Sequence, residues 1–203
     1  SGHLRPTKGH IEIDGGKTSA ASPLAFMQAG VAYIPEDRNS EGIVGDMAVW
    51  ENAVLSESRN AALVKSFTRL DKAACVAAAK KICAANDVRT QSINQPARLL
   101  SGGNVQKLLI GRWLARDPGI IIACQPSRGL DEGAISAVHK MLLAARDNDN
   151  AVLLISEDLD EILTLSDQIA VMFNGALSAP MDNDDLDVVQ LGLMMTGEGF
   201  DAV

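Results

Sequence analysis

The stretch VQKLLIGRWLARDPGIIIACQPSRGLDEGAISAVHKMLLAARDNDNAVLLIS (105–156) decides the fold class. Two segments with helical periodicity, 105–117 and 132–147, alternate with two short apolar runs, 119–124 and 151–156. Uniformly apolar runs separated by helices are typical of parallel strands covered on both faces. We therefore predict an α/β domain with a mostly parallel sheet and flanking helices.

The same alternation extends in both directions. An apolar strand is expected at 31–34, and a third strand of the later series at 168–173, where it meets an Asn174-Gly175 turn. Helices are expected at 157–166 and, as one terminal helix, beyond 182, where Met194 and Met195 should be buried. These elements fit one sheet with helices on both sides.

The first half of the chain contains shorter elements. An edge strand is expected at 10–15, and a short helix at 22–30 with Ser22 as N-cap, Pro23 in its first position and Gly30 as its stop. Segment 48–88 is rich in alanine and helical, and its apolar face includes Ala74, Ala78 and Ile82. This change of composition indicates a helical insertion.

Composition and charge narrow the classes of function. With 47% hydrophobic residues among 203, the chain can bury a sizeable core. Its net charge is -8, and its longest Lys/Arg run is the pair Lys80-Lys81, which argues against nucleic acid as a partner. The three cysteines, Cys75, Cys83 and Cys124, lack the paired spacing of a zinc site and are expected in the core.

The termini and the histidines carry little functional information. Apolar stretches stay well below the ~20 residues that span a bilayer, and the start has no signal-peptide core. The chain opens on Ser1 in a turn-like segment, so we expect a fragment of a longer polypeptide. The isolated histidines, His3, His10 and His139, have no metal partner at ligand spacing, and no metal site is predicted.

The most specific stretch is LSGGNVQKLLIGRWLARDP (100–118). Ser101, Gly102 and Gly103 precede a helix, so backbone N–H groups lie unblocked at the positive end of its dipole. Such an arrangement binds anions. Taken alone it equally describes a capped turn.

The ordered set of motifs resembles the nucleotide-binding domain of ABC transporters over residues 1 to about 180. LSGGNVQK is similar to the ABC signature, PSRGLD to the turn after the Walker B strand, and AVLLISEDLDEILTLSDQIAVMFNG to the switch region and last strands. GVAYIPEDRNSEGIVGDMAVWENAVL resembles the second domain of the fused ATPases of simple-sugar and nucleoside importers, and ACQPSRGLDEGA favours the nucleoside type. The resemblance implies a P-loop NTPase-like fold.

The resemblance also implies a division of the chain. Residues 1–45 and 101–181 would form an ATPase core incomplete at its N-terminus, 46–100 a helical signature subdomain, and 182–203 a C-terminal helical tail.

The phosphate-binding loop GxxxxGK[ST] is missing from the sequence. Gly16-Lys17-Thr18 imitates its end, but Ile11 stands where its first glycine belongs and no apolar helix follows, so we expect a polar turn there. The resemblance places the start of the chain just downstream of that loop, without the adenine-stacking aromatic. The chain is thus expected to lack its own phosphate cradle.

Four further positions depart from the family pattern. The magnesium-associated aspartate and the catalytic glutamate of the Walker B strand fall on Cys124 and Gln125. A thiol is a poor Mg²⁺ ligand, and an amide cannot accept a proton from attacking water. The Q-loop position holds Glu36 and the switch position Glu157, although an acid there also suits the first turn of a helix. ATP hydrolysis at this half-site is not expected.

The signature is intact, and the resemblance implies that it acts in trans. In head-to-tail ABC dimers each signature reaches the nucleotide held by the other domain. ATP and Mg²⁺ would therefore lie in a shared interface, with none expected for the isolated chain. The residues implied at that site are Ser101, Gly102, Gly103, Asn104 and Gln106, and Asp131 would contact the partner domain.

The implied protein is the ATP-binding subunit of an importer, in the cytoplasm on the inner face of the cell membrane. Its partners would be an N-terminal ABC half or a second copy, membrane permease subunits and, indirectly, a solute-binding protein. Motion would pass to the permease through Glu36 to Met47 and the helical insertion. Two alternatives stay open: a non-transport ABC protein acting in translation or DNA repair, and a non-catalytic regulatory domain.

Overall fold

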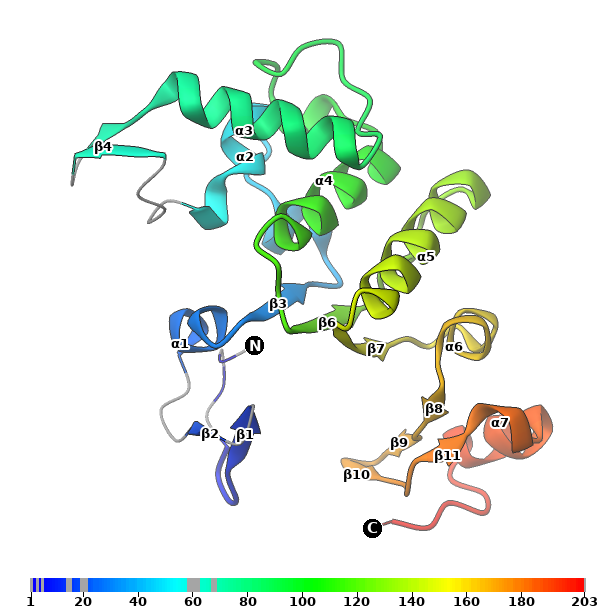
Figure 1. Cartoon of the computed structure of the whole chain (residues 1–203). Helices are drawn as coiled ribbons and strands as arrows, with labels where there is room; N and C mark the ends of the chain where they lie inside the picture. Colours follow the sequence, from blue (N-terminus) through cyan, green and yellow to red (C-terminus); the bar gives the residue numbers. More distant parts are fainter. Residues whose placement is uncertain are drawn as a thin grey trace. The chain divides into compact units, whose positions relative to one another are not determined.

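A computed structural model describes residues 2, 4, 6–13, 16–18, 22–57, 63–66 and 69–202, so His3 lies outside the described residues. The chain divides into two compact units, Ser1–Ile155 and Ser156–Val203, and each is described by itself (Figure 1).

The centre of the first unit is a three-stranded parallel sheet. It consists of β3 (Val31–Ile34), β6 (Ile120–Cys124) and β7 (Ala151–Ile155), in the order β3-β6-β7. The register aligns Tyr33 with Ile122 and Ile122 with Leu153. The parallel α/β architecture expected from the sequence is confirmed.

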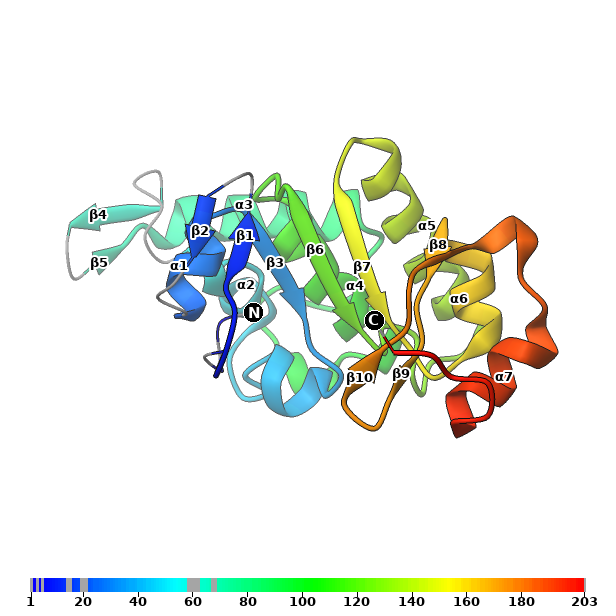
Figure 2. The ribbon, with the colours of Figure 1, turned by 90° about the horizontal axis from the view of Figure 1, so that it is seen from below.

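The two faces of this sheet differ. One face is packed against α4 (Gly102–Leu114) and α5 (Glu132–Asp147), which lie behind the strands in Figure 2. Ile34 and Ile121 on this face are at most 1% exposed. On the opposite face of β7, Leu153 is 54% and Ile155 48% exposed. Coverage of both faces was therefore a wrong expectation for β7, since the period of two along an edge strand leaves alternate side chains without a covering layer.

The helical insertion builds its own apolar cluster within the same unit. It contains α2 (Val49–Ala53) and α3 (Lys72–Ala85), with η2 (Leu55–Glu57), η3 (Ala97–Leu99) and the antiparallel strands β4 (Val64–Ser66) and β5 (Arg69–Leu70). Ile82 is buried as expected and Ala74 and Ala78 pack at the margin, while Cys75 and Cys83 are buried. Leu108 of α4 joins this cluster, so α4 belongs to both the insertion and the sheet layer.

The N-terminal elements form a hairpin and a short helix. Strands β1 (Ile11–Ile13) and β2 (Gly16–Thr18) pair antiparallel, and α1 (Pro23–Gln28) starts where the Ser22 Oγ accepts from the Ala25 N–H at 3.2 Å. Gly30 follows α1 with a left-handed φ of 78°. The expected polar turn at 16–18 is wrong, because antiparallel pairing with β1 holds this segment as a strand.

The second unit is small and antiparallel in its strands. It contains α6 (Leu159–Leu165), β8 (Gln168–Ile169), β9 (Met172–Phe173), β10 (Ala176–Leu177), β11 (Met181–Asp182), η4 (Asn183–Asp185) and α7 (Val188–Thr196). Residues 168–173 thus form two short strands, β8 paired with β11 and β9 with β10, and the prediction of one parallel strand is wrong. The Asn174-Gly175 turn, left-handed at both residues, returns the chain antiparallel after β9.

The predicted terminal helix is confirmed as α7. Met194 is 6% exposed and packs with Ile169, Val171 and Leu191, whereas Met195 is 37% exposed. The predicted boundaries at 46, 100 and 182 do not coincide with the two compact units and stay a prediction.

Candidate functional site

The N-terminus of α4 presents the LSGGN segment. Ser101 is the exposed N-cap, and its side chain makes no capping bond to an amide of the helix. Instead its Oγ accepts from Asn104 Nδ2 at 2.8 Å, and Asn104 Oδ1 accepts from the Arg89 N–H at 2.7 Å. Because the oxygen of Ser101 already accepts, its hydroxyl hydrogen is directed away from Asn104 and can donate to a ligand.

Both glycines of this segment are also required by packing. A Cβ on Gly103 would lie 2.6 Å from Cβ of Ala134 on α5, and a Cβ on Gly102 would lie 3.0 Å from Nη2 of Arg38. The glycines therefore allow α4 to approach its neighbours closely. The helix starts at Gly102, before residue 105 where periodicity alone placed it.

Gln106 lies inside the first unit. Its side chain is 2% exposed, within the stretch 105–112 of α4 that is buried throughout. The role expected of Gln106 beside a nucleotide of a partner domain stays a prediction.

The tip of β6 carries a thiol and an amide. Cys124 is half-buried rather than fully buried as expected, and burial raises the pKa of its thiol. The hydroxyl of Tyr33 on β3 hydrogen-bonds to this thiol. A protonated thiol bound to a phenol does not fit Mg²⁺, which prefers charged or carbonyl oxygen.

Gln125 continues the chain in a left-handed conformation. Its φ is 47°, and its backbone N–H donates to the carbonyl of Ile155 at 2.7 Å. The sheet therefore extends its pairing to the last residue before the turn. The amide side chain supplies no general base at this tip.

Asp131 and Glu36 have partners within the first unit. Asp131 is the N-cap of α5, where its Oδ1 accepts from the Ala134 N–H at 2.9 Å. Glu36 is exposed and forms an ion pair with Arg128 of the PSRGLD loop (126–131). The structure thus brings the Q-loop position and the turn after β6 together.

Glu157 belongs to the second unit, so it is not placed against these residues. Asp158 is the N-cap of α6 and accepts from the N–H groups of Asp160 and Glu161 at 3.0 and 3.2 Å. Glu157 therefore precedes the cap. Its expected place in the first helical turn is wrong, because Asp158 takes the cap position.

A buried polar cluster was not predicted from the sequence. Arg112 of α4 is 6% exposed and donates to the carbonyls of Gly42 at 2.9 Å and Asn52 at 3.2 Å, and burial lowers its pKa to about 10. The Asn52 side chain, fully buried, accepts from the Val44 N–H at 2.8 Å. The sequence signal that could have predicted this cluster is an arginine and an asparagine on otherwise apolar helix faces. Together they fix the loop between β3 and α2 against α4.

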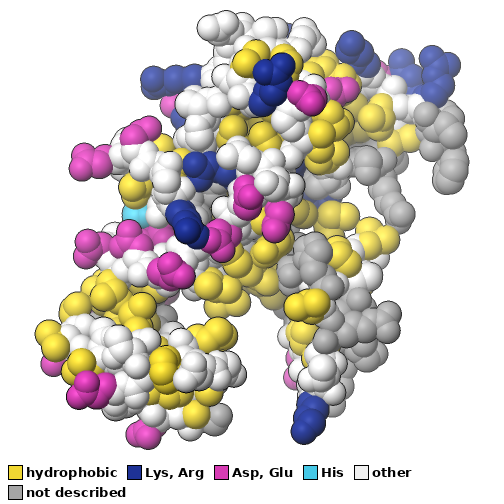
Figure 3. All heavy atoms as spheres, turned by 180° about the vertical axis from the view of Figure 1, so that it is seen from behind, with side chains coloured by type: hydrophobic (Ala, Val, Ile, Leu, Met, Phe, Trp, Pro, Cys, Tyr) yellow, Lys and Arg dark blue, Asp and Glu magenta, His cyan; other side chains and the backbone are white. Residues whose placement is uncertain are grey.

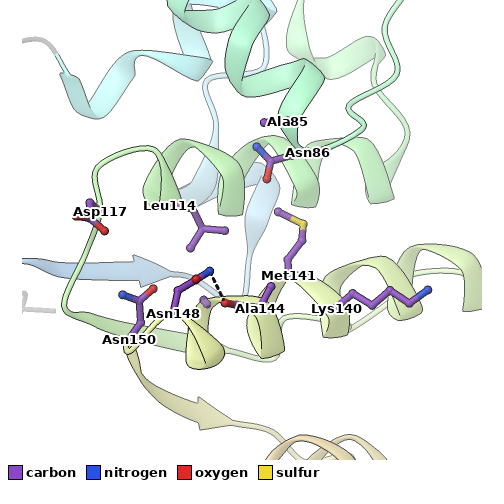
Figure 4. Close-up of a pocket in the computed structure, with 10 residues that line it drawn as sticks. Ala85, Asn86, Leu114, Asp117, Lys140, Met141, Ala144, Asn148 and Asn150 are labelled. Carbon is purple, nitrogen blue, oxygen red and sulfur yellow. Dashed lines mark hydrogen bonds between the residues drawn. The ribbon is translucent and has the colours of Figure 1, made fainter.

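A cavity of about 510 Å³ lies elsewhere in the first unit, near the C-terminal ends of α3, α4 and α5 (Figure 4). Two asparagine side chains that line the cavity bind carbonyls of their own helices. Asn86 Nδ2 donates to the carbonyl of Ile82 at 2.7 Å, and Asn148 Nδ2 donates to that of Ala144 at 2.8 Å. Leu114 on its wall stands a full helix length, roughly 20 Å, from Ser101. The cavity is therefore separate from the LSGGN segment.

Surface charge, the grouping of potential metal ligands and helix apolarity add three observations. On the face drawn in Figure 3, Lys and Arg side chains are interspersed with Asp and Glu. Across the residues that the structure describes, no three His, Cys, Asp or Glu side chains are grouped to hold a metal ion. In that same part of the chain, none of the helices has the length and apolarity to cross a membrane.

Sequence comparison identifies the class of protein. The profile of the ABC transporter family matches residues 1–128, and the chain therefore belongs to this family. Among its relatives are the glucose import ATP-binding protein TsgD13 of Haloferax volcanii and the guanosine import ATP-binding protein NupO of Bacillus subtilis. Each is 40% identical, over 94% and 96% of this chain respectively, but the chain covers only 35% and 38% of their lengths.

Solved structures agree on the fold. The ATP-binding cassette MJ1267 superimposes with a TM-score of 0.76 at 22% identity, covering 97% of this chain and 78% of that one. A dimeric cassette, MJ0796 bound to ADP and Pi, gives 0.72 at 19% identity, with 90% and 76% covered. The fold is that of an ABC ATPase cassette.

Proposed function

We propose that this chain is the second, catalytically degenerate ATP-binding half of an ABC importer for nucleosides or simple sugars. It supplies the LSGGN segment in trans to an ATP site whose phosphate loop belongs to a partner domain. The observation that carries the proposal is a contrast within one unit. Ser101 is exposed and its side chain makes no capping bond to α4, while the end of β6 has no carboxylate.

The relatives support the choice of transport over other ABC functions. Two are named for import of glucose and guanosine, and a third, 36% identical over 97% of this chain, is the nucleoside import ATP-binding protein NupA of Lactococcus lactis. The chain spans 38% of NupA, so a partner half in the same or another polypeptide is compatible with this similarity. The partners proposed are that half, or a second copy, and membrane permease subunits.

The chemistry at the start of α4 is donation to an anion. The hydroxyl of Ser101, oriented by Asn104, donates to an oxygen of the terminal phosphate. The N–H groups of Gly102 and Gly103 and the α4 dipole stabilise charge that develops there in the transition state. Bound ATP with its Mg²⁺ supplies the transferable phosphoryl group and neutralises phosphate charge.

The chain does not complete a hydrolytic site of its own. At the end of β6, Cys124 does not fit Mg²⁺, and Gln125 cannot take a proton from water. The loop 36–47, held to α4 by Arg112, is the segment through which closure of the dimer passes to the permease. The subunit would lie in the cytoplasm, peripheral to the membrane.

The test is ATP turnover of the chain alone, of a partner half with an intact phosphate loop alone, and of the two together. We expect no turnover by the chain alone and at least ~100-fold more by the mixture than by the partner half, since one transition-state donor is worth 10²–10³ in rate. A partner with its phosphate-loop lysine changed to alanine is the matched control. Turnover by the chain alone would contradict the proposal.

The alternatives are separated by a second measurement. The tagged chain, purified from cells with its partner half, should retain permease subunits. Retention of ribosomes or DNA in their place would favour the non-transport reading, and turnover of the mixture no higher than that of the partner would favour a regulatory domain.

A further inference from the structure

Arg38 occupies a tightly held position after β3. It starts η1 (Arg38–Gly42), a single π-helical turn. Asp37 caps this turn, accepting from the N–H groups of Asn39 and Ser40 at 3.0 Å each. A hydrogen bond from the Ser40 side chain is the main reason why the pKa of Asp37 lies below its usual value, and the bond from the Ser40 N–H adds to it. The backbone that carries Arg38 is thereby fixed.

The guanidinium of Arg38 crosses to the PSRGLD loop, about ninety residues away in the sequence. Nη1 donates to the carbonyl of Arg128 at 2.6 Å and Nη2 to that of Gly129 at 3.3 Å. The side chain of Arg128 in turn forms an ion pair with Glu36 in the loop after β3. The loop after β3 and the loop after β6 are therefore joined by two arginines running in opposite directions.

The same guanidinium also lies against the start of α4. A Cβ on Gly102 would meet its Nη2 at 3.0 Å, and a Cβ on Gly129 would meet the same atom at 3.7 Å. Gly129 is left-handed, with φ 67°, which turns its carbonyl toward Arg38. One side chain thus contacts two segments that carry proposed functional residues, Ser101 on one and Asp131 on the other.

Arginine suits this position for a chemical reason. Its planar fork presents several N–H donors in fixed directions, so one side chain can serve two carbonyls and still lie flat against a glycine. A lysine ammonium is a flexible point donor and would hold one carbonyl at a time.

We propose that Arg38 is a positioning residue that holds the LSGGN segment and the PSRGLD loop in one fixed relation. Movement of the loop after β3 is then transmitted to both segments together. The effect on ATP turnover rests on the proposed function, whereas the effect on the PSRGLD loop does not.

The first experiment measures kcat and KM for ATP in the mixture with a partner half. Arg38→Met should lower kcat about tenfold, comparable to the loss of one charge-assisted hydrogen bond. KM should change by less than about twofold, because the partner's phosphate loop holds the nucleotide. Arg38→Lys should recover part of kcat. Arg146→Met is the control, since Arg146 pairs with the adjacent Asp147 at 3.0 Å on α5, and it should leave both constants unchanged.

The second experiment uses the chain alone and does not depend on the proposed function. Amide hydrogen exchange should become at least ~10-fold faster at Arg128 and Leu130 in Arg38→Met, since their N–H bonds to Gln125 O and Ser127 O close the loop. Exchange at the centre of α5 should be unchanged. Unchanged exchange at Arg128 and Leu130 would overturn the inference. Faster exchange with no turnover by the wild-type mixture would instead contradict the proposed function.

Discussion

The start of α4 and the end of β6 lie in the same compact unit and offer opposite chemistry to a phosphate. At the start of α4 a serine hydroxyl is oriented by Asn104 and the first amides are not capped by a side chain. At the end of β6 the protonated thiol of Cys124 forms a hydrogen bond with Tyr33, and the next residue, Gln125, carries an amide. Under the proposed function, this cassette keeps the residues that donate to a nucleotide and lacks those that hydrolyse it.

The largest effect is expected from Ser101→Arg. A long side chain at the exposed N-cap would occupy the space in front of the α4 amides and displace a bound phosphate. Turnover of the mixture should fall by ~100-fold or more, as for the loss of a transition-state donor. Ser136→Arg, an equal change at an exposed position of α5, should leave turnover unchanged. Equal activity of the two variants would contradict a role of the start of α4 in ATP turnover.

A smaller effect is expected from Gly103→Ala, which tests packing at the start of α4. The added methyl would lie 2.6 Å from Cβ of Ala134, so the free energy of unfolding should fall by about 1–3 kcal/mol. Urea denaturation of the chain alone measures this. Ala134→Gly added to Gly103→Ala should restore part of the loss. If the single variant is as stable as the wild type, the close approach of α4 and α5 does not explain the glycine.

The smallest effect concerns the thiol at the end of β6. Because burial raises the pKa of the Cys124 thiol above its ordinary value, its thiolate fraction at pH 7.5 is below that of a free thiol. Alkylation by iodoacetamide, followed by mass spectrometry, should be slow at pH 7.5 and should accelerate as pH rises beyond 9.0. Cys124→Ser identifies the signal. Rapid alkylation near neutral pH would mean an activated thiolate at this tip.

Local patterns predicted much of the fold. The cap at Ser22 and the span 132–147 follow from residue type and periodicity, which act over a few residues. The strand pairing at 168–173 was not predictable in this way. An apolar run of six residues fits a buried parallel strand and two short antiparallel strands equally well, and only the pairing with β10 and β11 separates them.

The candidate site was predicted unevenly for the same reason. The sequence singled out Ser101, Cys124 and Gln125 because the hydroxyl, thiol and amide groups follow directly from the residue types. The burial of Gln106 was not predicted, because it depends on which face of α4 meets the rest of the unit. Arg38 and Arg112 were missed, since each acts on backbone carbonyls that carry no sequence signature.

The sequence by itself determined the order of helices and strands, the missing carboxylates at the end of β6 and the donors at the start of α4. These are local properties of residue type and spacing. The tertiary structure decided how Arg38 brings Gly102 and the PSRGLD loop together, how Arg112 fixes the loop before α2, and why Gly103 has no room for a side chain. Those relations join residues far apart in the chain, and only folding brings their atoms within contact distance.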